Sequence, residues 1–264
     1  MTTEAATGFV DVALEGHVAT VTLNRPDALN AISGQVADEL GGAFLQAAAR
    51  PDVWVVVLAA AGQRAFCVGA DLKERNQLDD RGWHRNRVLM KGMFEAVRSV
   101  PQPTVASVFG YALGGGFELA LACDLVVAAD DAVFGLPEVR VGIVPGGGGT
   151  QILARKIGVA RAKELVLTGR RISAEVGHEW GLVTQLVERG GLVNATRELA
   201  EELCRSSPVG AREAKWAMDR GLEVPLQQGI ELEELAWRRA VASEDRAEGI
   251  AAFNEKRDPQ WKGR

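Results

Sequence analysis

Hydrophobic residues along the chain follow the period of a strand in some segments and that of a helix in others. Apolar Ala19, Val21 and Leu23 alternate with threonines, which predicts a strand with one buried face. Residues 33–49 carry apolar side chains at helical spacing and predict an amphipathic helix. Residues 53–60 form a continuous aliphatic run, which favours a strand covered on both faces.

The alternation continues through the middle of the chain. A polar stretch over residues 79–99 is predicted to be partly helical and to end at Pro101. Residues 104–109 and 125–129 predict short strands, and residues 115–123 predict a helix between them. The pattern favours an α/β architecture of similar units, although the sequence contains no evident repeat.

The sequence changes character after about residue 190. It becomes rich in Ala, Glu, Leu and Arg, with helical periodicity and breaks at Pro208 and over residues 221–225. Three or more helices are expected, without a strand between them. We therefore predict a core over residues 1–195 that holds the active site, and a helical region over residues 196–264.

Composition and charge exclude several classes of protein. The chain has 264 residues, 47% hydrophobic and 25% charged, with a formal net charge of -5, so it is typical of a globular protein. Both signs of charge are interspersed, which argues against nucleic-acid binding and a basic membrane anchor. The uncharged interval 99–117 contains prolines and glycines and does not predict a membrane span, and the N-terminus shows no secretory signal.

The cysteines and histidines give no sign of a metal site. Cys67, Cys123 and Cys204 are far apart, and the three histidines are equally scattered. An odd number of unpaired cysteines agrees with a reducing compartment, so we expect a cytoplasmic protein without a bound metal.

Glycines gather in three clusters, over residues 65–73, 110–118 and 142–149. Phosphate binding does not fit, because Gly149 is followed by Thr150 rather than by the lysine of a P-loop. A dinucleotide fingerprint beginning at Gly114 would need glycine at position 119, where the chain has leucine.

The second cluster has a different physical use. Gly114, Gly115 and Gly116 lead into a predicted helix, whose first N–H groups have no internal partner. Such groups can stabilise a negative oxygen, and the junction over residues 69–71 is a candidate for the second donor of an oxyanion hole. The alternative, that these glycines serve only tight turns and close packing, remains open.

Two glutamates lie near these clusters. Glu118 falls in the first turn of the predicted helix, where an acid is also favourable for the helix dipole alone. Glu138 follows Pro137 in a predicted loop, where an acid is often merely solvated. Two carboxylates beside one oxyanion hole would permit paired acid–base chemistry.

At this point several separated motifs match a known family in the right order. The matching segments are LNRP (23–26), ALNA (28–31), AFCVGADLK (65–73), GGGFELA (114–120), ACD (122–124), FGLPE (134–138), GIVP (142–145), GTQ (149–151) and FNEKR (253–257). The chain resembles the crotonase superfamily, specifically the enoyl-CoA hydratases, over essentially its whole length. The resemblance implies a spiral of repeated ββα units and a C-terminal helical region that packs on the core and builds homotrimers or hexamers.

The resemblance also implies roles for individual residues. The amides of Ala70 and Gly115 would form the oxyanion hole, with Glu118 as base and Glu138 as acid. Contacts to coenzyme A and substrate would come from Arg25, Val68, Ala70, Asp71, Leu72, Lys73, Gly115, Phe253 and Lys256, the last two completing the site of an adjacent subunit. No metal or further cofactor is implied, because coenzyme A is part of the substrate.

The implied reaction is the reversible syn hydration of a trans-2-enoyl-CoA to a 3-hydroxyacyl-CoA. Isomerisation of a Δ3-enoyl-CoA to the Δ2 form, or another reaction of the family, is the alternative within the enzymes. A protein that only binds acyl-CoA, a scaffold or an RNA-binding relative is the alternative outside them. Residues 76–93, including Trp83 and His84, are expected to line or cover the acyl end of the substrate, and their polarity suggests a mobile flap.

Overall fold

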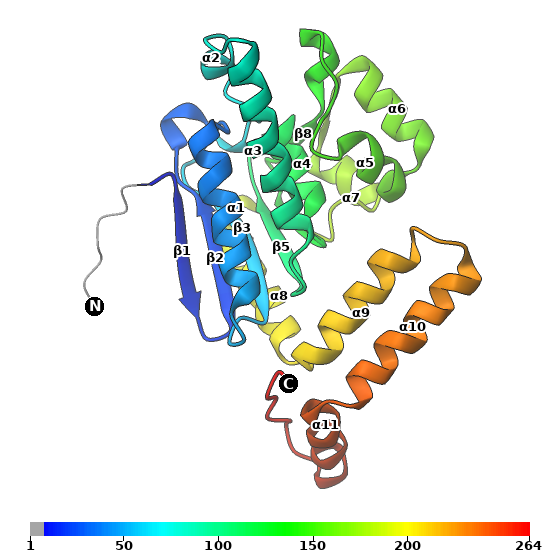
Figure 1. Ribbon diagram of the computed structural model, residues 1–264. Coiled ribbons are helices and arrows are strands. Elements are labelled where there is room, and N and C mark those ends of the chain that lie inside the picture. Colours follow the sequence, from blue (N-terminus) through cyan, green and yellow to red (C-terminus); the bar gives the residue numbers. More distant parts are fainter. Residues whose placement is uncertain (1–7) are drawn as a thin grey trace.

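The computed structural model describes residues 8–264 (Figure 1). The strands are β1 (Val10–Glu15), β2 (Val18–Leu23), β3 (Val55–Ala60), β4 (Ala65–Cys67), β5 (Thr104–Val108), β6 (Tyr111–Leu113), β7 (Leu125–Ala129), β8 (Val133–Gly135), β9 (Arg171–Ser173) and β10 (Gln185–Val187). The α-helices are α1 (Gly34–Ala49), α2 (Leu72–Arg75), α3 (Asp80–Arg98), α4 (Gly115–Ala122), α5 (Gly149–Ile157), α6 (Val159–Thr168), α7 (Ala174–Glu179), α8 (Leu192–Cys204), α9 (Pro208–Gly221), α10 (Leu226–Val241) and α11 (Glu244–Glu255). The described residues also form three short 3-10 helices: η1 (Pro26–Ala28), η2 (Pro137–Val141) and η3 (Arg189–Gly191).

The strands form two mixed sheets. The larger sheet has the order β1-β2-β3-β5-β7-β10, and the smaller has the order β4-β6-β8-β9. Successive pairs β3/β4, β5/β6 and β7/β8 each give one strand to each sheet, and each pair leads into a helical segment. The chain therefore advances by ββα units, and the predicted fold class is confirmed.

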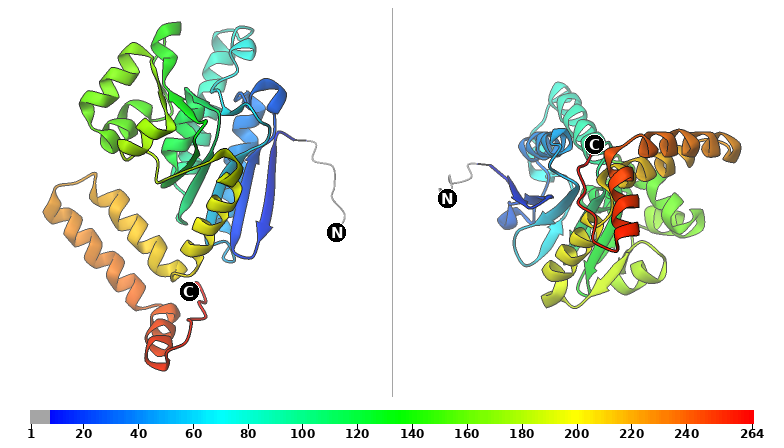
Figure 2. Two further views of the ribbon diagram at one scale, coloured as in Figure 1. Left: turned by 180° about the vertical axis from the view of Figure 1, so that it is seen from behind. Right: turned by 90° about the horizontal axis from the view of Figure 1, so that it is seen from below.

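The predicted strand over residues 53–60 begins two residues later, as β3, and is covered on both faces. Val56 and Leu58 pack in the main core with α1 and α3, whereas Val55 and Val57 pack in a second cluster with α8. Views from the front and from behind show these helices on opposite sides of the larger sheet (Figures 1 and 2).

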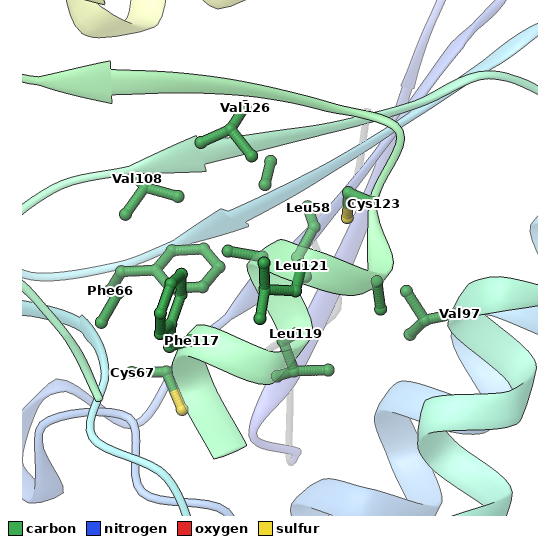
Figure 3. Packing of buried hydrophobic residues seen from close by; sticks show 14 of the residues in the cluster. Leu58, Phe66, Cys67, Val97, Val108, Phe117, Leu119, Leu121, Cys123 and Val126 are labelled. Atoms are coloured by element: carbon green, nitrogen blue, oxygen red, sulfur yellow. The ribbon is translucent and has the colours of Figure 1, made fainter. Parts of the chain in front are cut away.

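Helix α4 is buried in the middle of the molecule. Phe117, Leu119 and Leu121 pack among strand and helix side chains (Figure 3). A Cβ atom added at Gly116 would lie 2.1 Å from the carbonyl oxygen of Cys67, so only glycine allows the helix to begin this close to β4. Because buried side chains and strand β4 pack against α4, the position of its first turn is well fixed.

The four C-terminal helices α8 to α11 follow one another without a strand. Pro208 occupies the first turn of α9, and the pair α9 and α10 projects from the core (Figures 1 and 2). The ammonium group of Lys215 ties α9 to the core by hydrogen bonds to Gln102 O (3.0 Å) and Asp124 Oδ2 (2.6 Å). No helix within residues 8–264 has the length and apolar character needed to cross a bilayer.

Candidate active site

The β4–α2 and β6–α4 junctions lie directly against each other. Gly69 has φ +86°, and a Cβ atom there would lie 2.8 Å from the nitrogen of Gly115. Gly114 also has a positive φ, of +53°, just before α4 begins. These conformations favour glycine, so both positions make tight turns, and Gly69 also packs closely against the start of α4. The close approach of Gly69 to Gly115 also brings Ala70, the next residue, near Gly115.

The amides of Ala70 and Gly115 make no hydrogen bond to any described residue. Ile32 bonds to the peptide groups on either side of Ala70, donating to Gly69 O (2.8 Å) and accepting from Asp71 N (2.9 Å). Gly115 is the first residue of α4, whose initial N–H groups have no partner within the helix. Both residues line a cavity of about 670 Å³. Two free donors therefore border the cavity, as an oxyanion hole requires.

Glu118 is held at the cavity by two backbone amides. Its Oε1 atom accepts hydrogen bonds from Gly147 N (2.7 Å) and Gly149 N (2.8 Å), and the residue is 3% exposed. The third glycine cluster thus orients a carboxylate, a role that the sequence analysis did not identify. A Cβ atom at Gly147 would lie 2.4 Å from the ring of Phe94, so no larger residue fits there.

Glu138 lies in η2, a short helix where a loop was predicted. Its carboxyl group lies next to Gly114, because a Cβ atom there would be 3.2 Å from Glu138 Oε1. Its Oε2 atom is buried and has no hydrogen-bond partner among the described residues. Burial, and then the negative charge of Glu118, raise the pKa of Glu138 to about 7. The site therefore combines a carboxylate that accepts two N–H bonds with a carboxyl group that keeps its proton up to neutral pH.

The predicted acyl-end segment is mostly helical and contributes several side chains to the cavity. Most of it belongs to α3, from which Trp83, Asn86, Arg87 and Met90 line the cavity, whereas His84 does not. Arg75, at the end of α2, was not predicted and also lines the cavity.

The predicted coenzyme A contacts divide into two groups. Val68 and Leu72 line the cavity beside the oxyanion-hole residues. Arg25 and Asp71 instead form an ion pair of 2.7 Å, in which Asp71 also caps α2 by accepting from Lys73 N and Glu74 N. These two side chains therefore brace the β4–α2 junction.

Three further predicted contacts lie outside the cavity lining. Lys73 is exposed beside Leu72. Phe253, 83% exposed, and Lys256 lie on and just after α11, at the opposite end of the molecule from α2 (Figure 1). Within residues 8–264, no cluster of three or more His, Cys, Asp or Glu side chains could hold a metal ion.

The chain is similar to known proteins in both sequence and structure. A sequence model of the family described as "Enoyl-CoA hydratase/isomerase" matches residues 13–264. The human "Enoyl-CoA hydratase domain-containing protein 2, mitochondrial" is 41% identical over 251 residues, which cover 94% of this chain and 86% of the human protein. The "Short-chain-enoyl-CoA hydratase" of Clostridium acetobutylicum is 36% identical over 92% of this chain and 93% of its own. The crystal structure of an enoyl-CoA hydratase from Bacillus anthracis superposes with a TM-score of 0.94 at 41% identity, covering 97% of this chain and all of that one.

Proposed function

This chain belongs to the enoyl-CoA hydratase/isomerase (crotonase) family, and from that premise we propose that it catalyses the reversible syn hydration of a trans-2-enoyl-CoA to a 3-hydroxyacyl-CoA. The observation that carries the proposal is the pairing of two carboxyl groups in different environments at one cavity. Glu118 accepts two backbone N–H bonds, while Glu138 has a pKa raised to about 7. Such a difference in environment between two neighbouring carboxyl groups is the usual basis for assigning one as the base and the other as the acid.

In the proposed reaction, the substrate thioester oxygen accepts hydrogen bonds from the amides of Ala70 and Gly115. These donors stabilise the negative charge that the oxygen gains as an enolate forms. Glu118 removes a proton from water, whose oxygen bonds to C3 of the substrate. Glu138 gives its proton to C2, so the elements of one water molecule are added across the double bond. The protonated Glu118 and ionised Glu138 then return to their starting states by proton exchange.

The test is hydration of crotonyl-CoA, followed by the loss of the ultraviolet absorbance of its conjugated thioester. Glu118→Gln and Glu138→Gln should each lower kcat by at least about 100-fold, a typical contribution for a general acid or base. Glutamine at position 118 keeps an oxygen that can accept from Gly147 and Gly149, so the loop should stay in place. Unimpaired turnover in both variants would reject the assigned roles.

The same assay separates hydration from isomerisation. Isomerisation of a 3-enoyl-CoA needs a single well-placed carboxylate, whereas hydration uses both Glu118 and Glu138. Wild-type protein should therefore convert the 2-enoyl substrate much faster than its 3-enoyl isomer. A preference for the 3-enoyl substrate would make the protein an isomerase, and binding without turnover would make it an acyl-CoA-binding protein.

We propose further that residues 196–264 form a helical region that joins copies of the chain into a homotrimer or hexamer around the 1–195 core. Large apolar side chains are exposed on this region, among them Leu226 (80%), Trp237 (60%) and Phe253 (83%). Burying such side chains against a second copy removes apolar surface from water. In that assembly Phe253 and Lys256 would reach the coenzyme A of a neighbouring subunit. Within one subunit, Arg25 would lie near the phosphates of the bound coenzyme A, and Lys73 would lie along its adenine and pantetheine.

A cytoplasmic location is part of the same proposal. Cys67, Cys123 and Cys204 are all free thiols, and the first two are buried. Free thiols persist in a reducing compartment. The relatives include proteins named as mitochondrial, so fractionation of cells that express the tagged chain is the direct test.

A further inference from the structure

The cavity wall formed by α2 and α3 carries positive charge that the proposed hydration does not use. Arg75, at the end of α2, and Arg87, on α3, both line it, together with Asn86, the residue before Arg87. Apolar side chains of Ile32 and Met90 make up part of the same wall. A purely apolar acyl chain would need no arginine there.

The Arg75 guanidinium forms no ion pair within residues 8–264, although the nearby carboxylates of Glu74 and Glu118 favour its charged form. The guanidinium lies 5.5 Å from the centroid of the Trp83 ring, and its Nε atom is buried with no hydrogen-bond partner among the described residues. Burial, and then the positive charge of Arg87, lower the pKa of the Arg75 guanidinium. A positive group in this position is stabilised by any anion that enters the cavity.

Arg87 and Asn86 add donors on the neighbouring helix. Arg87 Nη1 donates to Gly146 O (2.9 Å), and neither arginine forms an ion pair with an acid within residues 8–264. Asn86 is only 6% exposed, yet its side-chain amide makes no hydrogen bond to any other described residue. Three polar side chains thus converge on one cavity while most of their donors remain free.

We infer that the physiological substrate carries a carboxylate at the far end of its acyl chain, bound by Arg75 and Arg87 with Asn86. The inference rests on the proposed hydration and adds its substrate class. A neutral alkyl chain would strip water from the half-buried Arg75 guanidinium without replacing its hydrogen bonds, which costs free energy. A terminal carboxylate would supply acceptors in the planar arrangement that a guanidinium prefers.

The experiment compares two substrates with each variant. Glutaconyl-CoA is a 2-enoyl thioester that ends in a carboxylate, and trans-2-hexenoyl-CoA is a neutral chain of similar length. Wild-type protein should show a kcat/KM at least about 10-fold higher for glutaconyl-CoA. Arg75→Met and Arg87→Met should each lower the ratio of the two kcat/KM values by about 10- to 100-fold, and Arg75→Lys should lower it less. Arg85→Met, on the exposed side of α3 and outside the cavity lining, is the matched control and should leave the ratio unchanged.

Two results would overturn the inference. The first is a wild-type preference for hexenoyl-CoA, and the second is an unchanged ratio of the two kcat/KM values in both methionine variants. If that unchanged ratio came with an equal loss for both substrates, Arg75 and Arg87 would bind the coenzyme A part instead. If wild-type protein hydrates neither substrate nor crotonyl-CoA, the proposed function fails instead. Calorimetry of the binding of the two thioesters then tests carboxylate recognition by Arg75 and Arg87 independently of turnover. Tighter binding of glutaconyl-CoA is the expected result.

Discussion

Replacing Glu138 with glutamine removes a carboxyl group that the folded protein ionises only with difficulty. The pKa of Glu138 rises from an ordinary value of 4.5 to about 7 because the group is buried near Glu118. At about 1.4 kcal/mol for each pH unit between those values, ionising Glu138 costs the folded protein up to about 3 kcal/mol.

The direction of the effect follows from proton binding. Below pH 4.5 the carboxyl group is protonated in both the folded and the unfolded chain, so it carries no penalty. Between 4.5 and about 7 only the folded chain keeps the proton, and wild-type stability falls as pH rises. Above about 7 the penalty is complete. Glu138→Gln lacks the penalty, so its stability relative to wild type should rise by up to about 3 kcal/mol between pH 4.5 and pH 8.

The assay is thermal unfolding of both proteins at a series of pH values under otherwise identical conditions. For a chain of this length, about 3 kcal/mol corresponds to a change of about 5 °C in the difference between the two Tm values. Replacement of the exposed Glu198 of α8 by glutamine is the control, and its Tm difference should be nearly constant with pH. A constant difference for Glu138→Gln, or one that falls as pH rises, would refute the account of its environment.

Further predictions concern pH, packing and assembly. The kcat for crotonyl-CoA hydration should fall as pH rises above about 7, because Glu138 must hold a proton to act as acid, and a pH–rate profile without that decline would contradict its role. Gly116→Ala should lower the Tm sharply, because the added Cβ atom would lie 2.1 Å from Cys67 O, whereas Gly92→Ala on α3 meets nothing within 4 Å and should raise stability by about 0.5–1 kcal/mol. Trp237→Glu should reduce the mass measured by light scattering toward that of a single chain, and an unchanged mass would place the subunit contact elsewhere.

The longer elements of the fold were predictable because several periods of their hydrophobic pattern lie within one segment. The predicted helix over residues 33–49 is α1, with Ser33 as its cap, and residues 125–129 form β7. The short strands of the smaller sheet went unrecognised, since three residues are too few to display a period. Their pairing depends on distant segments, as when β8 pairs with β9. The spiral arrangement followed only from the family resemblance.

The candidate site was predictable to the extent that its chemistry is local in sequence. Glycines before a helix predicted the free amide of Gly115, and the structure leaves that donor free at the cavity. The hydrogen bonds from Gly147 and Gly149 to Glu118 escaped prediction, because backbone donors about thirty residues away leave no signature in side-chain type. Arg75 was not predicted, because no motif in its own segment indicates that the fold brings it to the cavity wall.

The most direct test of the central proposal is a crystal structure of the protein with a bound, slowly reacting acyl-CoA analogue. The account predicts a thioester oxygen at about 2.7–3.1 Å from both the Ala70 and Gly115 nitrogens, the distances expected for an oxyanion hole. It also predicts that Glu118 and Glu138 both face the C2–C3 bond. A thioester oxygen that reaches only one of the two amides, or a carboxyl group turned away from that bond, would contradict it.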